Sequence, residues 1–304
     1  MKLVRIILLN RNTVLVLAVI VGLIFGKYAE FLKPYTVVAL ALTMTFSLTG
    51  LDFSVLNSFK KIVKPFFAGI ILNYFLFGSV ILTLAWFLMP SDELFYGFVV
   101  IVAAPPGVAI IPFSYILKGN VNYAIVGVSA AFLASIFFAP LLVDFFAGSK
   151  GISSFDLFLT MLQLVVLPLI IAQFLRLKYL FPFVQKVRGK VVDWGFAFLI
   201  FVAVGLNRQV FFSDPKKLFL VSIVLFLGLF GLGILYDFVA KKFKVDPSIR
   251  LTQNMLATIK SSGFSVFTAI TLFGKEAAIP SAVLAVMVLF YLIFLSIKVS
   301  RVSK

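Results

Sequence analysis

The stretch IKSSGF at residues 259–264 decides the fold class of this chain, because it interrupts an apolar run that extends from about residue 251 to residue 273. If a membrane span begins near residue 249, Lys260 lies about 16 Å deep, close to the middle of a bilayer. A charged side chain at that depth costs roughly 3 kcal/mol, so it is rarely kept without a partner or a function. A second interruption, APPG at residues 104–107, cuts the apolar run at 95–117. Two broken membrane helices in corresponding halves of a chain are typical of a transporter's binding site.

The composition is that of a polytopic membrane protein. Of the 304 residues, 62% are hydrophobic and 12% are charged, which is more apolar surface than a water-soluble fold can bury. The chain contains no Cys and no His, so disulfides, thiol nucleophiles, imidazole bases and the commonest transition-metal ligands are excluded. We therefore expect no cofactor, no metal site and no enzymatic activity. The net charge of +16 comes from basic residues in short loops, which favours a role in membrane orientation over nucleic-acid binding.

The hydropathy predicts ten transmembrane segments in an all-α fold. They lie at approximately residues 13–26, 34–50, 64–89, 95–117, 121–147, 155–175, 189–206, 216–240, 249–273 and 277–299. With this count, most of the 27 Lys and Arg residues fall on the side of the two termini. The positive-inside rule therefore predicts an integral protein of the cell (inner) membrane with both termini in the cytoplasm.

The two halves of the chain resemble each other. Gly107 and Gly263, one in each interruption, are 156 residues apart, and Gly119 and Gly274, in the polar turns that follow, are 155 apart. Five segments per half is an odd number, so the halves would lie in opposite orientations across the membrane. The sequence thus predicts two inverted repeats, residues 1–152 and 153–304, whose broken helices four and nine cross.

Each interruption has a simpler interpretation. Pro-Pro-Gly can be only a kink, and Lys260 can extend along its stem to an interface or cap the carbonyls that end the first half of its own segment. The matched pair of breaks and the depth of Lys260 favour a functional site instead, with a fixed positive charge that offsets carbonyl ends or helps to hold an anionic substrate. After each break a half-helix begins, and its free N–H groups bind anions.

Three stretches carry a resemblance to a known family. AAPPGVAIIPFSYILKGN at residues 103–120 resembles CCPGGTASNVxTYLAxGN, a segment of the bile acid:sodium symporter family. MTFSL at 44–48, followed by Asp52 and Phe53, looks like that family's MGLTLxxxDF, and residues 259–264 are similar to its MQNSGL. The resemblance implies a ten-span fold with a core bundle of spans three to five and eight to ten and a panel of spans one, two, six and seven. It also implies organic-anion substrates in the groove between them.

The sodium-ligating positions of that family carry other residues here. Hydrocarbon side chains stand at five of them: Ile110, Ile111, Ala124, Val128 and Leu256. Lys260 falls on the position of a Gln, and Asn73 is the polar counterpart of another Gln. Since hard cations need oxygen ligands, sodium is not expected as a partner, and Lys260 would supply the ion's charge.

The sequence therefore predicts a secondary transporter of a small organic anion that works by alternating access without sodium. The carboxylates fall in loops or near span ends, so any proton coupling is left to Lys260. An uncoupled facilitator is the alternative, and a Ser-Lys intramembrane hydrolase is a third reading. The candidate substrate-binding residues are Asn73, Pro106, Gly107, Val108, Ile111, Lys260, Ser261, Ser262 and Gly263.

Overall fold

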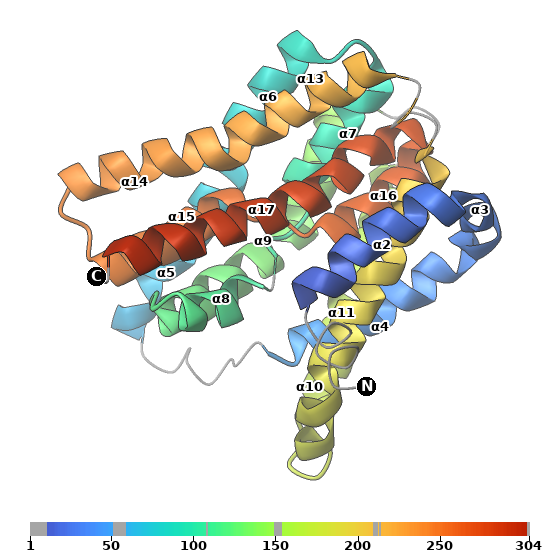
Figure 1. Cartoon of the computed structure of the whole chain (residues 1–304). Coiled ribbons are helices and arrows are strands. Elements are labelled where there is room, and N and C mark those ends of the chain that lie inside the picture. The colour runs from blue at the N-terminus through green and yellow to red at the C-terminus, as the bar shows by residue number, and fades with distance from the viewer. Residues whose placement is uncertain are drawn as a thin grey trace.

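The computed structural model describes residues 11–50, 59–107, 109–148, 154–208, 212 and 214–302, and its elements there are all helices (Figure 1). In chain order they are α2 (Arg11–Phe25), η1 (Gly26–Tyr28), α3 (Ala29–Leu32), η2 (Lys33–Tyr35), α4 (Thr36–Leu48), α5 (Phe59–Ile70), the π-helix η4 (Ile71–Leu76), α6 (Phe77–Leu88), α7 (Asp92–Ala103), α8 (Ile110–Ile116), α9 (Val121–Ala147), α10 (Ser154–Leu175), α11 (Phe181–Leu206), α13 (Pro215–Phe226), the π-helix η5 (Leu227–Gly231), α14 (Leu232–Lys242), α15 (Pro247–Thr258), α16 (Ser262–Phe273), η6 (Glu276–Ala278) and α17 (Ile279–Val302). The prediction of an all-helical chain is confirmed for the described residues.

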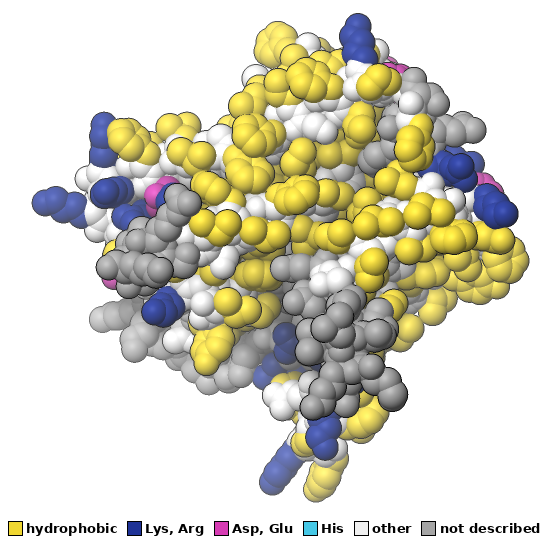
Figure 2. Space-filling model, viewed as in Figure 1, with side chains coloured by type: hydrophobic (Ala, Val, Ile, Leu, Met, Phe, Trp, Pro, Cys, Tyr) yellow, Lys and Arg dark blue, Asp and Glu magenta, His cyan; other side chains and the backbone are white. Residues whose placement is uncertain are grey.

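Six helical stretches in the described part of the chain are long and apolar enough to cross a membrane. They are Thr13–Leu48, Ile62–Leu88, Val121–Ala147, Phe181–Leu206, Pro215–Lys242 and Glu276–Val299. Apolar side chains cover much of the face shown in Figure 2, while Lys and Arg gather toward its ends. Large aromatic side chains such as Trp86, Phe87 and Phe145 are 68%, 79% and 80% exposed, which suits a lipid environment.

The two predicted interruptions are real breaks in the helices. α7 ends at Ala103, and Ala104 turns to an extended conformation (φ −59°, ψ 147°), because a residue before proline is disfavoured in the helical region. Pro105 and Pro106 cannot donate the backbone hydrogen bonds that would continue the helix. In the second break, Ile259 is extended after α15 (φ −97°, ψ 113°), and α16 begins at Ser262.

The same succession of elements occurs twice along the chain. A helix, a π-helix, a second helix and a third helix that ends at a break follow one another from Phe59 to Ala103 and again from Pro215 to Thr258. Each element of the second series begins 155 or 156 residues after its counterpart in the first. This agrees with the spacing of the two glycines in the breaks.

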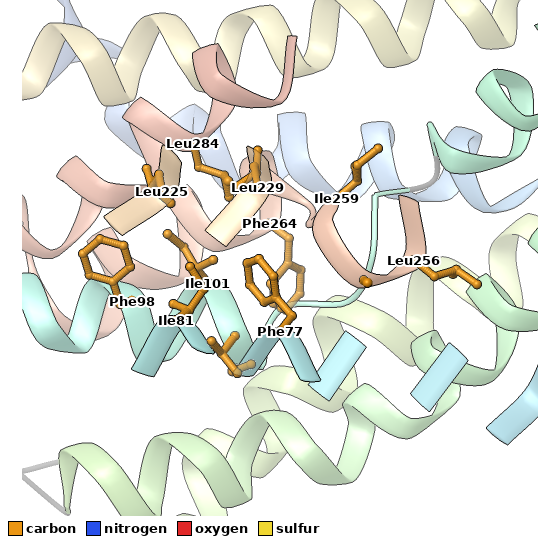
Figure 3. Packing of buried hydrophobic residues seen from close by; sticks show 14 of the residues in the cluster. Phe77, Ile81, Phe98, Ile101, Leu225, Leu229, Leu256, Ile259, Phe264 and Leu284 are labelled. Carbon is orange, nitrogen blue, oxygen red and sulfur yellow. The ribbon is translucent and has the colours of Figure 1, made fainter. Parts of the chain in front are cut away.

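The buried apolar side chains form two clusters. The larger one joins α6, α7, α9 and α13 to α17, and Figure 3 shows part of it, with Phe77, Phe98 and Phe264 between the helices. The smaller one lies where α2 and α11 meet α16 and α17, and it is rich in alanine. α11 also packs closely on α4, where Gly195 lies against the Thr43 side chain. Small residues at such contacts allow membrane helices to approach closely.

Candidate functional site

The two breaks lie side by side and are joined through their backbones. The Gly107 N–H donates to the Ile259 carbonyl at 3.1 Å, and the Ser261 N–H donates to the Pro105 carbonyl at 3.0 Å. Pro106 and Lys260 therefore pair in antiparallel fashion. These bonds satisfy backbone groups that the interrupted helices cannot, which non-helical backbone inside a membrane requires.

Lys260 is buried where the two breaks pair, with only 3% of its surface exposed. Its Nζ donates to the Val102 carbonyl at 2.9 Å and to the Asn73 carbonyl at 3.5 Å. It also lies 4.7 Å from the ring centroid of Tyr74 and 5.6 Å from that of Phe77, within range of cation–π attraction. Because Val102 is in the last turn of α7, the ammonium offsets the negative end of that helix. The carbonyls thus belong to the other broken helix, α7, and to η4, whereas the simpler sequence interpretation placed them on the segment of Lys260 itself.

Asn73 contacts Lys260 through its backbone rather than its side chain. It lies in the π-helix η4, a widened turn of the kind that occurs at functional sites. The Asn73 side chain is fully buried, and neither its nitrogen nor its oxygen has a hydrogen-bond partner among the described residues. The polar group that the sequence singled out in this segment is thus beside the lysine but is not bound to its ammonium.

A small cavity of about 40 Å³ lies against the breaks. Gly107, Lys260, Ser261 and Ser262 of the breaks line it on one side. The rest of the lining comes from the following residues: Leu15, Ala109, Phe196, Ile200, Ile259, Ala285, Val288, Leu289 and Leu292. Pockets for small organic ligands usually measure several hundred Å³, so this cavity is too small for an organic substrate in the present conformation.

An aromatic side chain of α11 packs on the start of α16. A Cβ atom on Gly263 would lie 2.6 Å from Cδ1 of Phe196 and 3.3 Å from Cδ1 of Leu199, so the close contact depends on glycine. Ser261 occupies the N-cap position of α16, but its side chain makes no capping hydrogen bond. The Ser261 hydroxyl therefore does not cap the first N–H groups of α16. This end of the helix lies next to the cavity and against the ring of Phe196.

Five positions where the family resemblance predicted sodium ligands are filled with hydrocarbon. All five side chains are buried in the larger cluster: Ile110, Ile111, Ala124, Val128 and Leu256. A methyl of Leu256 lies only 2.7 Å from where a Cβ would stand on Gly127, which leaves no space between α15 and α9. Among the described residues, no three His, Cys, Asp or Glu side chains come together in a way that could hold a metal ion.

The predicted site residues separate into three groups. Pro106, Gly107, Lys260, Ser261 and Ser262 are brought together where the two breaks pair, and Gly263 follows them at the start of α16 against Phe196. Asn73 lies beside Lys260, and Ile111 is 8% exposed within the larger cluster. Val108 lies outside the described residues.

Sequence reasoning missed the side of the cavity that faces the breaks. Leu15 of α2 and Phe196 and Ile200 of α11 line it. They are apolar residues in apolar helices, so hydropathy does not distinguish them and only their position opposite the breaks identifies them.

Comparison with known proteins supplies three relatives and a family. The family described as "Sodium Bile acid symporter family" matches residues 37–214. The chain is 25% identical over 275 residues to the probable sodium/metabolite cotransporter BASS1, chloroplastic, of Arabidopsis thaliana, covering 89% of this chain and 68% of that protein. It is 26% identical over 285 residues to the uncharacterized sodium-dependent transporter YocS of Bacillus subtilis (strain 168), covering 90% and 85%. It is 24% identical over 226 residues to the arsenical-resistance protein Acr3 of Alkaliphilus metalliredigens (strain QYMF), covering 71% and 63%.

Proposed function

Because this chain belongs to the sodium bile acid symporter family, we propose that it moves a small organic anion across the membrane by alternating access. It is a membrane transporter and not an enzyme, which removes the Ser-Lys hydrolase from consideration. Two relatives are named as a sodium/metabolite cotransporter and a sodium-dependent transporter, and the third is named as an arsenical-resistance protein. The proposed substrate class comes from the family resemblance, whereas the proposed sodium independence comes from the residues of this chain.

The proposed architecture is a ten-span protein made of two inverted repeats, residues 1–152 and 153–304. The recurrence of helix, π-helix, helix and broken helix at a spacing of 155 or 156 residues supports it. In this arrangement α5 to α9 and α13 to α17 form the core bundle, and α2, α4, α10 and α11 form the panel that moves against it. The loop charges favour the cell membrane, with both termini in the cytoplasm.

The proposed substrate site is the cavity between the crossed breaks and α2 and α11. The N-terminus of α16 supplies uncapped N–H groups and the positive end of a 12-residue helix, both of which favour an anion. Phe196 now covers that end, so substrate entry requires α11 to move away from α16. Such a movement is what alternating access would provide.

The proposal of sodium independence rests mainly on the surroundings of the Lys260 ammonium. This ammonium lies in the bundle with backbone carbonyls and aromatic rings around it, which is how a buried cation is held. Five of the positions where the resemblance implies oxygen ligands to sodium are hydrocarbon, and only Asn73 keeps an amide. We therefore propose that Lys260 provides the positive charge where the sodium-dependent relatives bind an ion. Proton coupling through Lys260 and uncoupled facilitation are the two remaining modes.

The test begins with a thermal-shift screen of small organic anions, because a bound ligand raises the stability of the folded protein. Counterflow of the best ligand is then measured in proteoliposomes with sodium or with choline. We expect equal rates. A stimulation by sodium of about tenfold, equivalent to 1.4 kcal/mol, would contradict sodium independence. Accumulation driven by an imposed pH gradient would identify proton coupling, whereas equilibration without accumulation under any gradient would identify a facilitator.

A further inference from the structure

The turn between α10 and α11 carries a surface that the transport proposal does not use. We propose that residues 174–190, called the α10–α11 tip below, bind the headgroups of anionic phospholipids. The two helices meet at the lowest point of Figure 1, away from the breaks. At the same place in Figure 2, Lys and Arg side chains lie next to apolar ones.

The tip is strongly and uniformly basic. Five cations lie within it: Arg176, Lys178, Lys186, Arg188 and Lys190. The sequence has no acidic residue from 157 to 192, so the tip's own stretch of chain offers these cations no counter-charge. The three lysines are exposed. Each Lys or Arg near an anionic membrane surface contributes about 1 kcal/mol of attraction, so this charge matches anionic headgroups.

The tip also exposes apolar side chains between its charges. Tyr179 is 93% exposed, Phe183 66%, Leu177 54% and Leu180 47%. On α11, Phe183 precedes Lys186 by three residues and therefore shares a helix face with it. Apolar groups and lysines that alternate in this way are typical of segments at the boundary between headgroups and acyl chains, where the rings enter the apolar layer and the lysines reach the phosphates.

The tip is fixed to the rest of the protein rather than hanging free. Nη1 of Arg176 donates to the Thr49 carbonyl at 2.8 Å, at the end of α4, and its guanidinium carbon lies 5.0 Å from the ring centroid of Phe181. Val184, one turn into α11, is 3% exposed and anchors the buried face. The charged and aromatic groups are therefore presented in one arrangement, which lowers the entropic cost of binding.

A lipid fits this surface better than a second copy of the chain. A symmetric contact between two copies would place the same three exposed lysines of each tip against each other. Like charges brought together in this way repel, whereas anionic headgroups neutralise them. The proposal does not depend on the substrate or on sodium, so its test is separate from the test of transport.

The absence of cysteine allows a single fluorescent label on the tip. Gln185→Cys, at an exposed position of α11, is labelled with a nitroxide-sensitive fluorophore and placed in phosphatidylcholine nanodiscs. These nanodiscs contain equal small fractions of nitroxide-labelled phosphatidylglycerol or nitroxide-labelled phosphatidylcholine. We expect stronger quenching by phosphatidylglycerol, and an enrichment that falls about fivefold for each lysine removed. The triple variant Lys178→Gln, Lys186→Gln, Lys190→Gln should abolish the preference.

The matched control removes three lysines elsewhere on the side assigned to the termini: Lys241→Gln, Lys242→Gln and Lys244→Gln. This triple variant should retain the preference at the tip. Equal quenching by the two lipids in the parent protein, or an equal loss in both triple variants, would overturn the proposal. A label that neither lipid quenches and that responds to the protein-to-lipid ratio would show a contact between copies and would overturn it too.

Discussion

The first and second breaks occupy corresponding places in the two halves, yet they contribute different chemistry to the crossing. The first, at residues 104–109, has no ionisable side chain: its Pro105 carbonyl accepts a hydrogen bond and its Gly107 N–H donates one, while the Val102 carbonyl that accepts from Lys260 lies in α7 just before the break. The second, at residues 259–261, supplies the ammonium of Lys260 and the N–H of Ser261 as donors. Repetition of one helical plan has thus left two breaks that exchange backbone hydrogen bonds in both directions, while only the second supplies a charged donor.

Reversing the charge of the second break should have the largest effect. In Lys260→Glu, a carboxylate would face the carbonyls of Val102 and Asn73, and an uncompensated buried charge costs about 3 to 5 kcal/mol. We expect little or no monodisperse protein after detergent extraction. The control Lys275→Glu disturbs an exposed pair with Glu30, whose side chains are 50% and 59% exposed, and should cost less than about 1 kcal/mol. A Lys260→Glu variant as thermostable as the parent would show that the two breaks do not differ in this way.

Adding a side chain to the glycine of the second break should abolish binding while leaving the protein folded. In Gly263→Leu the new atoms would collide with the ring of Phe196 and fill the space at the start of α16. The measurement is ligand-induced thermal stabilisation, with size-exclusion chromatography as the check on folding. Combining Gly263→Ala with Phe196→Ala should relieve the contact and restore binding relative to Gly263→Ala alone. If Gly263→Leu still binds the ligand, the site lies elsewhere.

Neutralising the lysine should have an intermediate effect. Lys260→Gln keeps a donor but loses the charge, and charged hydrogen bonds contribute about 1.5 to 3 kcal/mol. We expect folded protein with a lower melting temperature and weaker anion binding. Lys260→Met, which removes the donor as well, should be less stable than Lys260→Gln. Unchanged binding and transport in Lys260→Gln, together with a lower melting temperature, would mean that the lysine only caps α7.

The smallest effect concerns two helix N-caps. The Asn120 side chain accepts from the Tyr123 N–H at 2.9 Å, so Asn120→Ala should lower stability by about 1 kcal/mol. The Ser261 side chain makes no such bond at the start of α16, so Ser261→Ala should leave the stability of the free protein almost unchanged. Chemical or thermal unfolding in detergent compares the two. A larger loss for Ser261→Ala than for Asn120→Ala would show that the hydroxyl already has a structural role without ligand.

Much of the fold could be predicted from local features of the chain. The all-helical class follows from long apolar runs, and both breaks follow from residues that cannot continue a helix or cost too much in lipid, Pro105 and Pro106 in one and Lys260 in the other. The sequence identified the cavity-lining side chains that belong to the breaks, because only the breaks contain such signals. Phe196, Leu15 and Ile200 carry no signal, because one apolar residue in a membrane helix resembles the next.

By itself, the sequence determined that this chain is a helical membrane protein, that two of its helices are broken, and that a lysine stands in one break. Those properties depend on residue type and on neighbours in the chain. Only the tertiary structure decided that Lys260 serves the carbonyls of α7 and η4, that Asn73 meets it through its backbone, and that Phe196 covers Gly263. Each of these joins residues more than 60 positions apart, and the packing of helices, which hydropathy does not encode, sets which carbonyl or ring the side chain reaches.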